Sequence, residues 1–205
     1  MPFAVEPSTE ISNRYDLAKL CNARGYKDAV EIGVDHAVFS RQFLSNFKGH
    51  WLILVDPYEP FPEMAYDRAP DMLAAAQALR PFHGRFRFVR ERSEAAARFV
   101  RSFVTPDFVY IDGAHDYENV KKDIEIWWKE LTLNGMLAGH DYDKAHPDVI
   151  RAVTEFASDN NLVVRLTQET DFPPSWYIYR TEPKYLIYQY WRTGRDLNQH
   201  YRGSA

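Results

Sequence analysis

The stretch Phe108-Val109-Tyr110-Ile111-Asp112-Gly113-Ala114-His115-Asp116-Tyr117 decides the fold class of this chain. Its first four residues are β-branched or aromatic, which predicts a buried strand. A helix pattern follows, with apolar residues at three- and four-residue spacing from Val120 to Leu131. Open α/β sheets bind their ligands where a parallel strand ends just before a helix. We therefore expect Asp112 and His115 to face a ligand site.

The same alternation of strand and helix extends in both directions from this stretch. Strands are predicted at 29–33, 51–56, 86–90, 108–112 and 136–141, and helices at 9–24, 39–47, 71–80, after 91–94, from 117 and at 147–158. Two further strands, 162–167 and 175–180, are joined by seven residues, which is too short for a parallel crossover. The pattern predicts an α/β fold with a seven-stranded, mostly parallel sheet, a C-terminal antiparallel β-hairpin and helices on both faces.

Length and composition limit the classes of protein to consider. The 205 residues suffice for one domain, predicted at 1–180, and an aromatic-rich C-terminal arm at 181–205 that could contact a second copy in a homodimer. The net charge of −4 gives no electrostatic reason to expect a nucleic-acid partner. No run approaches the about 20 apolar residues of a membrane span, and the N-terminus lacks the features of a signal peptide. We expect a cytoplasmic protein, in which the single cysteine, Cys21, is a packing residue.

Polar residues end four of the predicted strands. They are Glu31 to Gly33, Asp56, Asp112 and the pair His140-Asp141. An acid at the end of the second strand, about 20 residues after the first strand–helix turn, suits the two hydroxyls of a ribose. The alternative for Asp56 is a turn cap ahead of Pro57.

These pieces resemble the class I S-adenosylmethionine-dependent methyltransferases, most closely methyltransferase family 24, which is related to the sugar and macrolide O-methyltransferases. The resemblance covers nearly all of residues 28–180, and its five pieces stand in the family's order and spacing. The pieces are Val30-Glu31-Ile32-Gly33-Val34, Leu54-Val55-Asp56-Pro57-Tyr58, Arg92-Ser93-Glu94, Asp107 to Ile124, and Asn134 to Tyr142, with Ser175-Trp176-Tyr177 resembling the family's closing hairpin. The resemblance implies a Rossmann-like fold and methyl transfer to a small-molecule acceptor, with oxygen as the expected methyl acceptor atom.

The resemblance also implies roles for individual residues. S-adenosylmethionine would be held by Glu31, Gly33, Asp56, Ser93, Glu94 and Asp112. In the metal-dependent relatives a divalent ion lowers the pKa of the acceptor hydroxyl, and the corresponding positions here are Asp112, His140 and Asp141. Magnesium prefers oxygen ligands, whereas the nitrogen of His140 suits manganese, zinc or iron better. Catalysis without metal is the alternative, with His115 or His140 as the base.

His115 is the first candidate for the general base. It follows Asp112 by three residues, and the pKa of imidazole lies near the working pH. Its structural alternative is a histidine that caps the helix beginning near Tyr117. Asp116 is interpreted as a helix cap and not as a catalyst.

One position departs from the family pattern. The family usually has a second glycine after Glu-Ile-Gly, where this chain has His36-Ala37. Ala37 adds only a methyl group, so cofactor binding should survive if φ is negative there. The departure also permits a second reading, a cofactor-binding or interaction protein that has lost catalysis. A nicotinamide-dependent oxidoreductase would need Gly-x-Gly-x-x-Gly, and the stretch from Gly33 to Val38 lacks it.

Overall fold

A computed structural model describes residues 3–8, 11–60, 65–168 and 173–181. These residues form one sheet in the order β1-β7-β8-β6-β5-β2-β3-β4. The strands are β1 (Ala4–Pro7), β2 (Asp28–Ile32), β3 (Trp51–Val55), β4 (Phe86–Val89), β5 (Phe108–Ile111), β6 (Met136–Gly139), β7 (Val163–Leu166) and β8 (Trp176–Tyr179). The helices are α1 (Leu17–Ala23), α2 (Val38–Asn46), α3 (Ala69–Ala78), α4 (Ser93–Val100), α5 (Tyr117–Glu130) and α6 (Pro147–Asp159), with single 3-10 turns η1 (Arg14–Asp16) and η2 (Arg80–Phe82).

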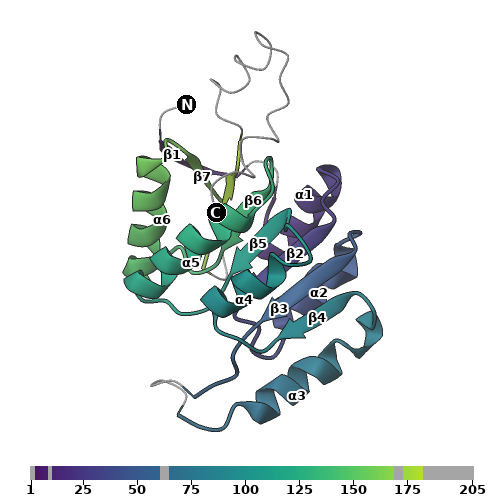
Figure 1. Cartoon of the computed structure of the whole chain (residues 1–205). Coiled ribbons are helices and arrows are strands. Elements are labelled where there is room, and N and C mark those ends of the chain that lie inside the picture. Colours follow the sequence, from purple (N-terminus) through teal and green to yellow (C-terminus); the bar gives the residue numbers. More distant parts are fainter. Residues whose placement is uncertain (1–2, 9–10, 61–64, 169–172, 182–205) are drawn as a thin grey trace.

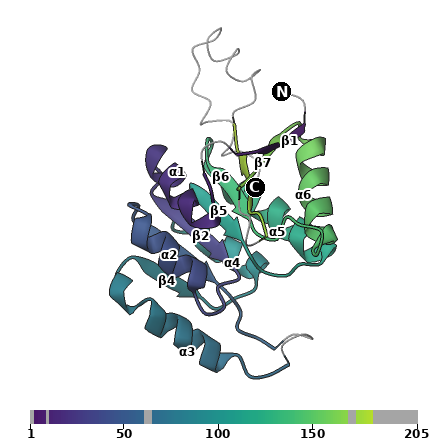
Figure 2. The same cartoon turned by 180° about the vertical axis from the view of Figure 1, so that it is seen from behind.

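Helices cover both faces of the sheet. Helices α4, α5 and α6 lie on the face nearer the viewer in Figure 1, and α1 and α2 lie on the face seen in Figure 2. Alternate residues of the central strands supply the two cores, because successive strand side chains point to opposite faces. In β3, Leu52 and Leu54 pack with α1 and α2, while Ile53 and Val55 pack with α4, α5 and α6. The continuous apolar runs that predicted buried parallel strands are therefore explained by a hydrophobic core on each face of the sheet.

The fold class predicted from the sequence is confirmed, and the strand count is corrected from seven to eight. Strand β8 is antiparallel to both β6 and β7, as the predicted hairpin requires. The additional strand is β1, which pairs in parallel with β7 and places Ala4 beside Val163. Its four residues form a largely exposed edge with no alternation, so periodicity gave no signal for it.

The helix expected at 9–24 begins later than predicted. Asn13 caps the η1 turn by accepting bonds from the backbone N–H groups of Tyr15 and Asp16. Ser8 lies before this turn, and its hydroxyl accepts bonds of 2.7 Å from the Tyr177 hydroxyl and 3.3 Å from the Ile11 N–H. In α4, which follows 91–94 closely, Ala96 and Val100 are buried, whereas Phe99 is 56% exposed.

The order of strands reverses beside β2. From β2 the chain adds β3 and β4 on one side, and β5 and then β6 on the other. At such a switch point the strand–helix loops diverge and leave space for a ligand at the carboxyl ends of the strands. Gly33, directly after β2, has φ +83°, and a Cβ atom there would lie 2.0 Å from the Asp112 backbone oxygen. Only glycine lets the ends of β2 and β5 approach so closely.

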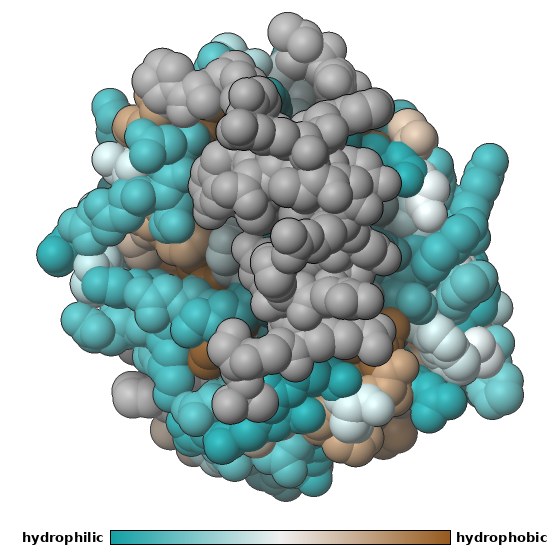
Figure 3. Space-filling model, turned by 45° about the horizontal axis from the view of Figure 1, so that its top comes forward, coloured by the Kyte–Doolittle hydropathy of each residue, from teal (hydrophilic) through white to brown (hydrophobic). Residues whose placement is uncertain are grey.

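On the face drawn in Figure 3, the surface formed by the described residues is mainly polar. Figure 3 shows one face on which hydrophilic side chains predominate and hydrophobic areas are small and separate. Among the described helices, none has the length and apolar character needed to cross a membrane. The predicted arm at 181–205 lies outside the described residues apart from Thr181, so the arm and the homodimer stay predictions.

Candidate active site

Four of the predicted site residues meet at the carboxyl ends of β5 and β6. Nε2 of His115 lies 2.9 Å from Oδ2 of Asp141, and Nδ1 of His140 lies 3.0 Å from Oδ1 of the same carboxylate. The same His140 nitrogen lies 3.7 Å from Oδ1 of Asp112. One aspartate thus bridges two histidines, and a second aspartate stands beside them.

Local backbone geometry holds these residues in place. Asp141 has φ +57°, in the left-handed region that a non-glycine residue adopts at a cost. Such strained residues are concentrated at functional sites. Asp116 caps α5 by accepting a bond of 3.1 Å from the Asn119 N–H, which confirms its interpretation as a helix cap. The cap fixes the start of α5 directly after His115, so that His115 is not itself the cap.

The electrostatics of the site favour one charged carboxylate and one carboxyl that is easily protonated. Burial alone would raise the pKa of Asp141, but the hydrogen bonds from His115 and His140 bring it well below its usual value. Burial raises the pKa of Asp112 to about 6, although the neighbouring His140 acts in the opposite direction. The hydrogen bond to Asp141 raises the pKa of His115. Asp141 is therefore the fixed negative charge of the site.

Arg14, from the η1 turn, completes the cluster. Its Nη1 lies 3.1 Å from Nε2 of His140 and 3.6 Å from Oδ2 of Asp112. Arg14 was not predicted, because no motif or periodic pattern surrounds it. The signal available in the sequence was a basic residue in the segment between β1 and β2.

The predicted metal ligands Asp112, His140 and Asp141 lie close enough together to share an ion. Arginine has donors and no acceptor, so Nε2 of His140 must accept from Arg14 and the ring proton must be on Nδ1. That proton occupies the nitrogen that faces both aspartates. This donor set does not fit a cation, and no chemical step is assigned to a metal here.

His146 is a further histidine that the sequence analysis left without a role. Its Nδ1 lies 2.9 Å from Oδ1 of Asp143, and its ring centroid is 4.9 Å from that of His115. It belongs with His115 and Asp141 to a second group of side chains with metal-ligand spacing. Its position just before α6 places it on the same β6–α6 loop as His140 and Asp141.

Asp56 ties the end of β3 to the loop after β2. Its Oδ2 accepts bonds of 3.0 Å from the N–H groups of both Val34 and Asp35, and its Oδ1 accepts one of 2.7 Å from Tyr58. Asp56 therefore organises the loop that follows β2. Its Oδ1, with a single donor among the described residues, keeps capacity for one more hydrogen bond.

Ala37 does not meet the condition that the sequence analysis set for cofactor binding, because its φ is +60° and not negative. A non-glycine residue in this left-handed region carries backbone strain. Its methyl group is fully buried in the core with Phe39 and Phe43. The substitution therefore costs backbone strain, and the added methyl group is accommodated within the core.

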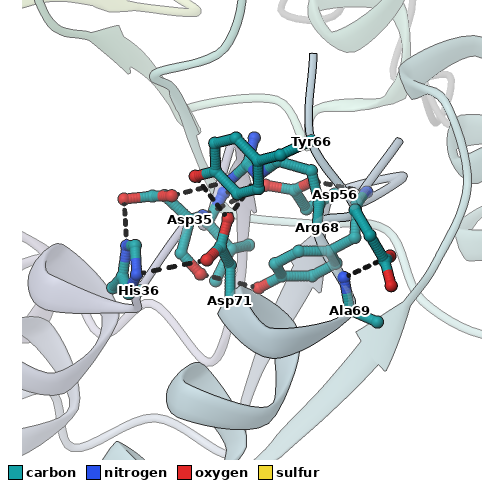
Figure 4. A network of polar contacts seen from close by, with 10 residues as sticks. Asp35, His36, Asp56, Tyr66, Arg68, Ala69 and Asp71 are labelled. Atoms are coloured by element: carbon teal, nitrogen blue, oxygen red, sulfur yellow. Dashed lines mark hydrogen bonds and ion pairs between the residues drawn. The ribbon is translucent and has the colours of Figure 1, made fainter. Parts of the chain in front are cut away.

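Figure 4 shows how the loop that holds Ala37 is tied to the start of α3. Arg68 binds Asp35 at 2.6 Å through Nη2 and Asp71 at 2.5 Å through Nε. His36 bridges the same two aspartates at 2.7 and 3.4 Å. These contacts join Asp35 and His36, which stand in the loop after β2, to Arg68 and Asp71 at the start of α3.

The remaining predicted cofactor residues differ in their surroundings. Glu31 is buried in β2, its Oε2 accepts a bond of 2.5 Å from Ser40, and burial raises its pKa well above the usual value. The Ser93 hydroxyl accepts a bond of 2.7 Å from the Trp127 indole. Glu94 pairs with Lys122 at 2.7 Å. Ser93 and Glu94 thus join α4 to α5, and their cofactor role stays a prediction.

Comparison with known proteins identifies the family. The family described as Methyltransferase domain, methyltransferase family 24, matches residues 30–142, which is more than half of the chain. No curated protein sequence matches the chain.

Several solved structures share the fold. An O-methyltransferase from Bacillus cereus in complex with S-adenosylhomocysteine is 12% identical with a TM-score of 0.61, covering 81% of this chain and 80% of that one. An O-methyltransferase of tomaymycin synthesis from Streptomyces achromogenes, bound to S-adenosylmethionine, is 14% identical with a TM-score of 0.61, at 82% and 79% coverage. An rRNA methylase from Streptococcus thermophilus is 13% identical with a TM-score of 0.55, at 76% and 87% coverage. At these identities the likeness establishes the fold, and the family match supplies the identity. The chain belongs to methyltransferase family 24 and is a class I S-adenosylmethionine-dependent methyltransferase.

Proposed function

We propose that this enzyme methylates a hydroxyl oxygen of a small-molecule acceptor, with His115 as the general base. The observation that carries the proposal is the 2.9 Å contact between Nε2 of His115 and the carboxylate of Asp141. An aspartate that orients a histidine in this way makes one ring nitrogen a donor and leaves the other as a base.

The chemistry requires little beyond positioning and removal of a proton. S-adenosylmethionine, when bound, supplies a methyl carbon that is already electrophilic. Because the Asp141 carboxylate only accepts, Nε2 of His115 carries the proton and Nδ1 carries the lone pair. No hydrogen bond to that Nδ1 occurs within the described residues, and the His115 side chain is 50% exposed. An acceptor hydroxyl that reaches Nδ1 would lose its proton as oxygen attacks the methyl carbon.

Protonation of His115 sets the direction of the pH dependence. The bond to Asp141 raises the pKa of His115, so the base is protonated and inactive below that pKa. The transfer rate should therefore rise with pH through the raised pKa of His115. Asp141 remains ionised over this range, because its own pKa lies well below the usual value.

The cofactor is proposed to lie along the carboxyl ends of β2, β3 and β5. Gly33 and Asp112 meet at the switch point, Asp56 can accept a further bond from a ribose hydroxyl, and Glu31 supports the loop through Ser40. The methyl group of Ala37 is buried in the core and is not exposed beside these residues. Ser93 and Glu94 are the weakest members of the predicted set, because their side chains are occupied by α5.

Two considerations support oxygen and a small acceptor. A hydroxyl needs a base far more than an amine with a free lone pair does, and the site presents a base. Two of the structural neighbours named above act as O-methyltransferases, while the third, an rRNA methylase, shows that the fold alone does not select the acceptor. The net charge of −4 argues against a nucleic-acid acceptor.

The test compares His115→Ala with wild type in two measurements. Calorimetric titration with S-adenosylhomocysteine should give unchanged affinity, because His115 faces the acceptor side. Formation of S-adenosylhomocysteine from S-adenosylmethionine, over a panel of catechols, sugars and hydroxy acids, should fall about 100-fold or more for any acceptor that wild type methylates.

His83→Ala is the matched control, since His83 is exposed at the end of η2 and remote from the cluster. It should leave both measurements unchanged. Transfer that survives in His115→Ala at the wild-type rate would rule out His115 as the base. Selective transfer to amines would overturn the assignment to oxygen.

A further inference from the structure

We propose that Arg14 is a positioning residue that takes the place of a divalent cation in this site. The proposal concerns the cluster of Asp112, His140 and Asp141, whose oxygen and nitrogen atoms have metal-ligand spacing. The effect that we propose on catalysis rests on the proposed function of His115. The effect that we propose on metal binding can be tested without any acceptor.

The guanidinium group stands where it would compete with an ion. Nη1 of Arg14 is 3.1 Å from Nε2 of His140 and 3.6 Å from Oδ2 of Asp112, and the Arg14 side chain is only 15% exposed. Guanidinium is permanently charged and offers only donors. A fixed positive charge therefore already faces the carboxylate and the imidazole that a metal ion would need.

The hydrogen bonds then form a directed chain. Arg14 donates to Nε2 of His140, so the His140 proton is on Nδ1 and points 3.0 Å to Oδ1 of Asp141. The second oxygen of Asp141 accepts from Nε2 of His115 at 2.9 Å. Arg14 thus fixes the tautomer of His140, His140 helps to hold the Asp141 carboxylate, and Asp141 orients His115.

The same chain works against metal binding. An ion coordinated by Nδ1 of His140 would require the ring proton to move to Nε2, where it would point at the Arg14 donor. Two donors would then face each other at 3.1 Å, and the ion would add a second positive charge beside the guanidinium. Binding of an ion therefore requires Arg14 to leave.

Arg14 also lies outside the part of the chain that the family shares. The family match covers residues 30–142, and Arg14 belongs to the preceding η1 turn. The contact joins residues 126 positions apart in the sequence. This chain thus adds its own N-terminal segment to a site otherwise built from the strand ends of the shared domain.

The experiment is calorimetric titration of the whole chain with Mn²⁺ for wild type, Arg14→Ala, Arg14→Lys and the double variant Arg14→Ala/His140→Ala. Loss of the guanidinium in Arg14→Ala should tighten Mn²⁺ binding by about tenfold or more, because a nearby like charge is removed. Arg14→Lys keeps a positive donor and should resemble wild type. The gain should disappear in the double variant, which lacks the imidazole ligand.

Comparison among these variants separates this cluster from the group of His115, Asp141 and His146, since an ion held there binds equally with or without Arg14. Arg14→Gln, of similar size and uncharged, replaces Arg14→Ala if the alanine variant does not fold, and should show the same gain. S-adenosylhomocysteine affinity reports that each variant is intact.

Three results would overturn the proposal: equal Mn²⁺ affinity in wild type and Arg14→Ala, a gain that persists without His140, or wild-type binding that His140→Ala abolishes. With any acceptor that wild type methylates, Arg14→Ala should lower kcat, and Arg14→Lys should restore most of it. A preparation that methylates nothing would count against the proposed function alone, because the Mn²⁺ comparison would still stand.

Discussion

Replacement of Gly33 by alanine should destabilise the fold more than any other glycine substitution considered below, because two independent costs coincide there. The first is conformational: Gly33 has φ +83°, and an L-residue in the left-handed region costs about 1–2 kcal/mol. The second is steric. A Cβ at Gly33 would lie 2.0 Å from the Asp112 backbone oxygen, where ordinary contact begins at 3.4 Å.

Relief of that overlap requires the ends of β2 and β5 to separate by about 1.4 Å, the difference between those two distances. The bond of 2.8 Å from the Asp112 N–H to the Ile32 carbonyl spans this gap and would be lost. An unmade buried backbone bond costs about 1–3 kcal/mol. Together the terms predict a loss of about 2–5 kcal/mol in the free energy of unfolding.

Urea unfolding followed by tryptophan fluorescence measures this loss, and two glycines provide matched controls. Gly84 has φ +85° with no atom within 4 Å of its added Cβ, so Gly84→Ala isolates the conformational cost of about 1–2 kcal/mol. Gly113 has its nearest neighbour at 3.8 Å, so Gly113→Ala should stay within about 0.5 kcal/mol of wild type. If Gly33→Ala costs no more than Gly84→Ala, the close approach of β2 and β5 is refuted.

Three further substitutions test the polar networks. Arg68→Ala should cost about 3 kcal/mol of unfolding free energy, because it leaves a buried aspartate without its cation; Arg98→Ala, in an exposed pair, should cost under about 0.5 kcal/mol. Asp141→Asn replaces the charged acceptor that raises the pKa of His115 with a neutral one, so the acidic limb of the pH–rate profile should move to lower pH while the maximal rate falls; an unmoved limb would mean that another group titrates. Burial raises the pKa of the Glu31 carboxyl well above its usual value. The folded protein therefore loses stability as pH rises through that raised pKa and the buried carboxyl ionises. Glu31→Gln should therefore stabilise the fold at pH 7 and leave it almost unchanged near about pH 4, as thermal unfolding at the two pH values would show.

The sequence by itself determined the mostly parallel sheet, its closing hairpin and the strand ends that carry the site, whereas the strand order came from the structure. A strand that is buried on both faces has a continuous apolar run, as from Phe108 to Ile111. A helix that is buried on one face has apolar residues three or four positions apart, as from Val120 to Leu131. These patterns are local, because each strand or helix repeats its orientation every two or about 3.6 residues. Parallel strands then bring their carboxyl ends to one edge, so Asp112, His115, His140 and Asp141 could be placed together before any contact was known.

Contacts between segments that are remote in the sequence were decided only by the tertiary structure. Strand β1 was missed because its pairing with β7 depends on a free sheet edge and not on its own pattern. Arg14 was not predicted because its role depends on its contact with His140, which lies 126 residues away in the sequence. The positive φ of Ala37 was visible only in the structure, since the sequence set a negative φ as a condition for cofactor binding and predicted neither sign. Periodicity records which face of an element is buried, whereas the partner of a single polar side chain depends on how several elements pack against one another.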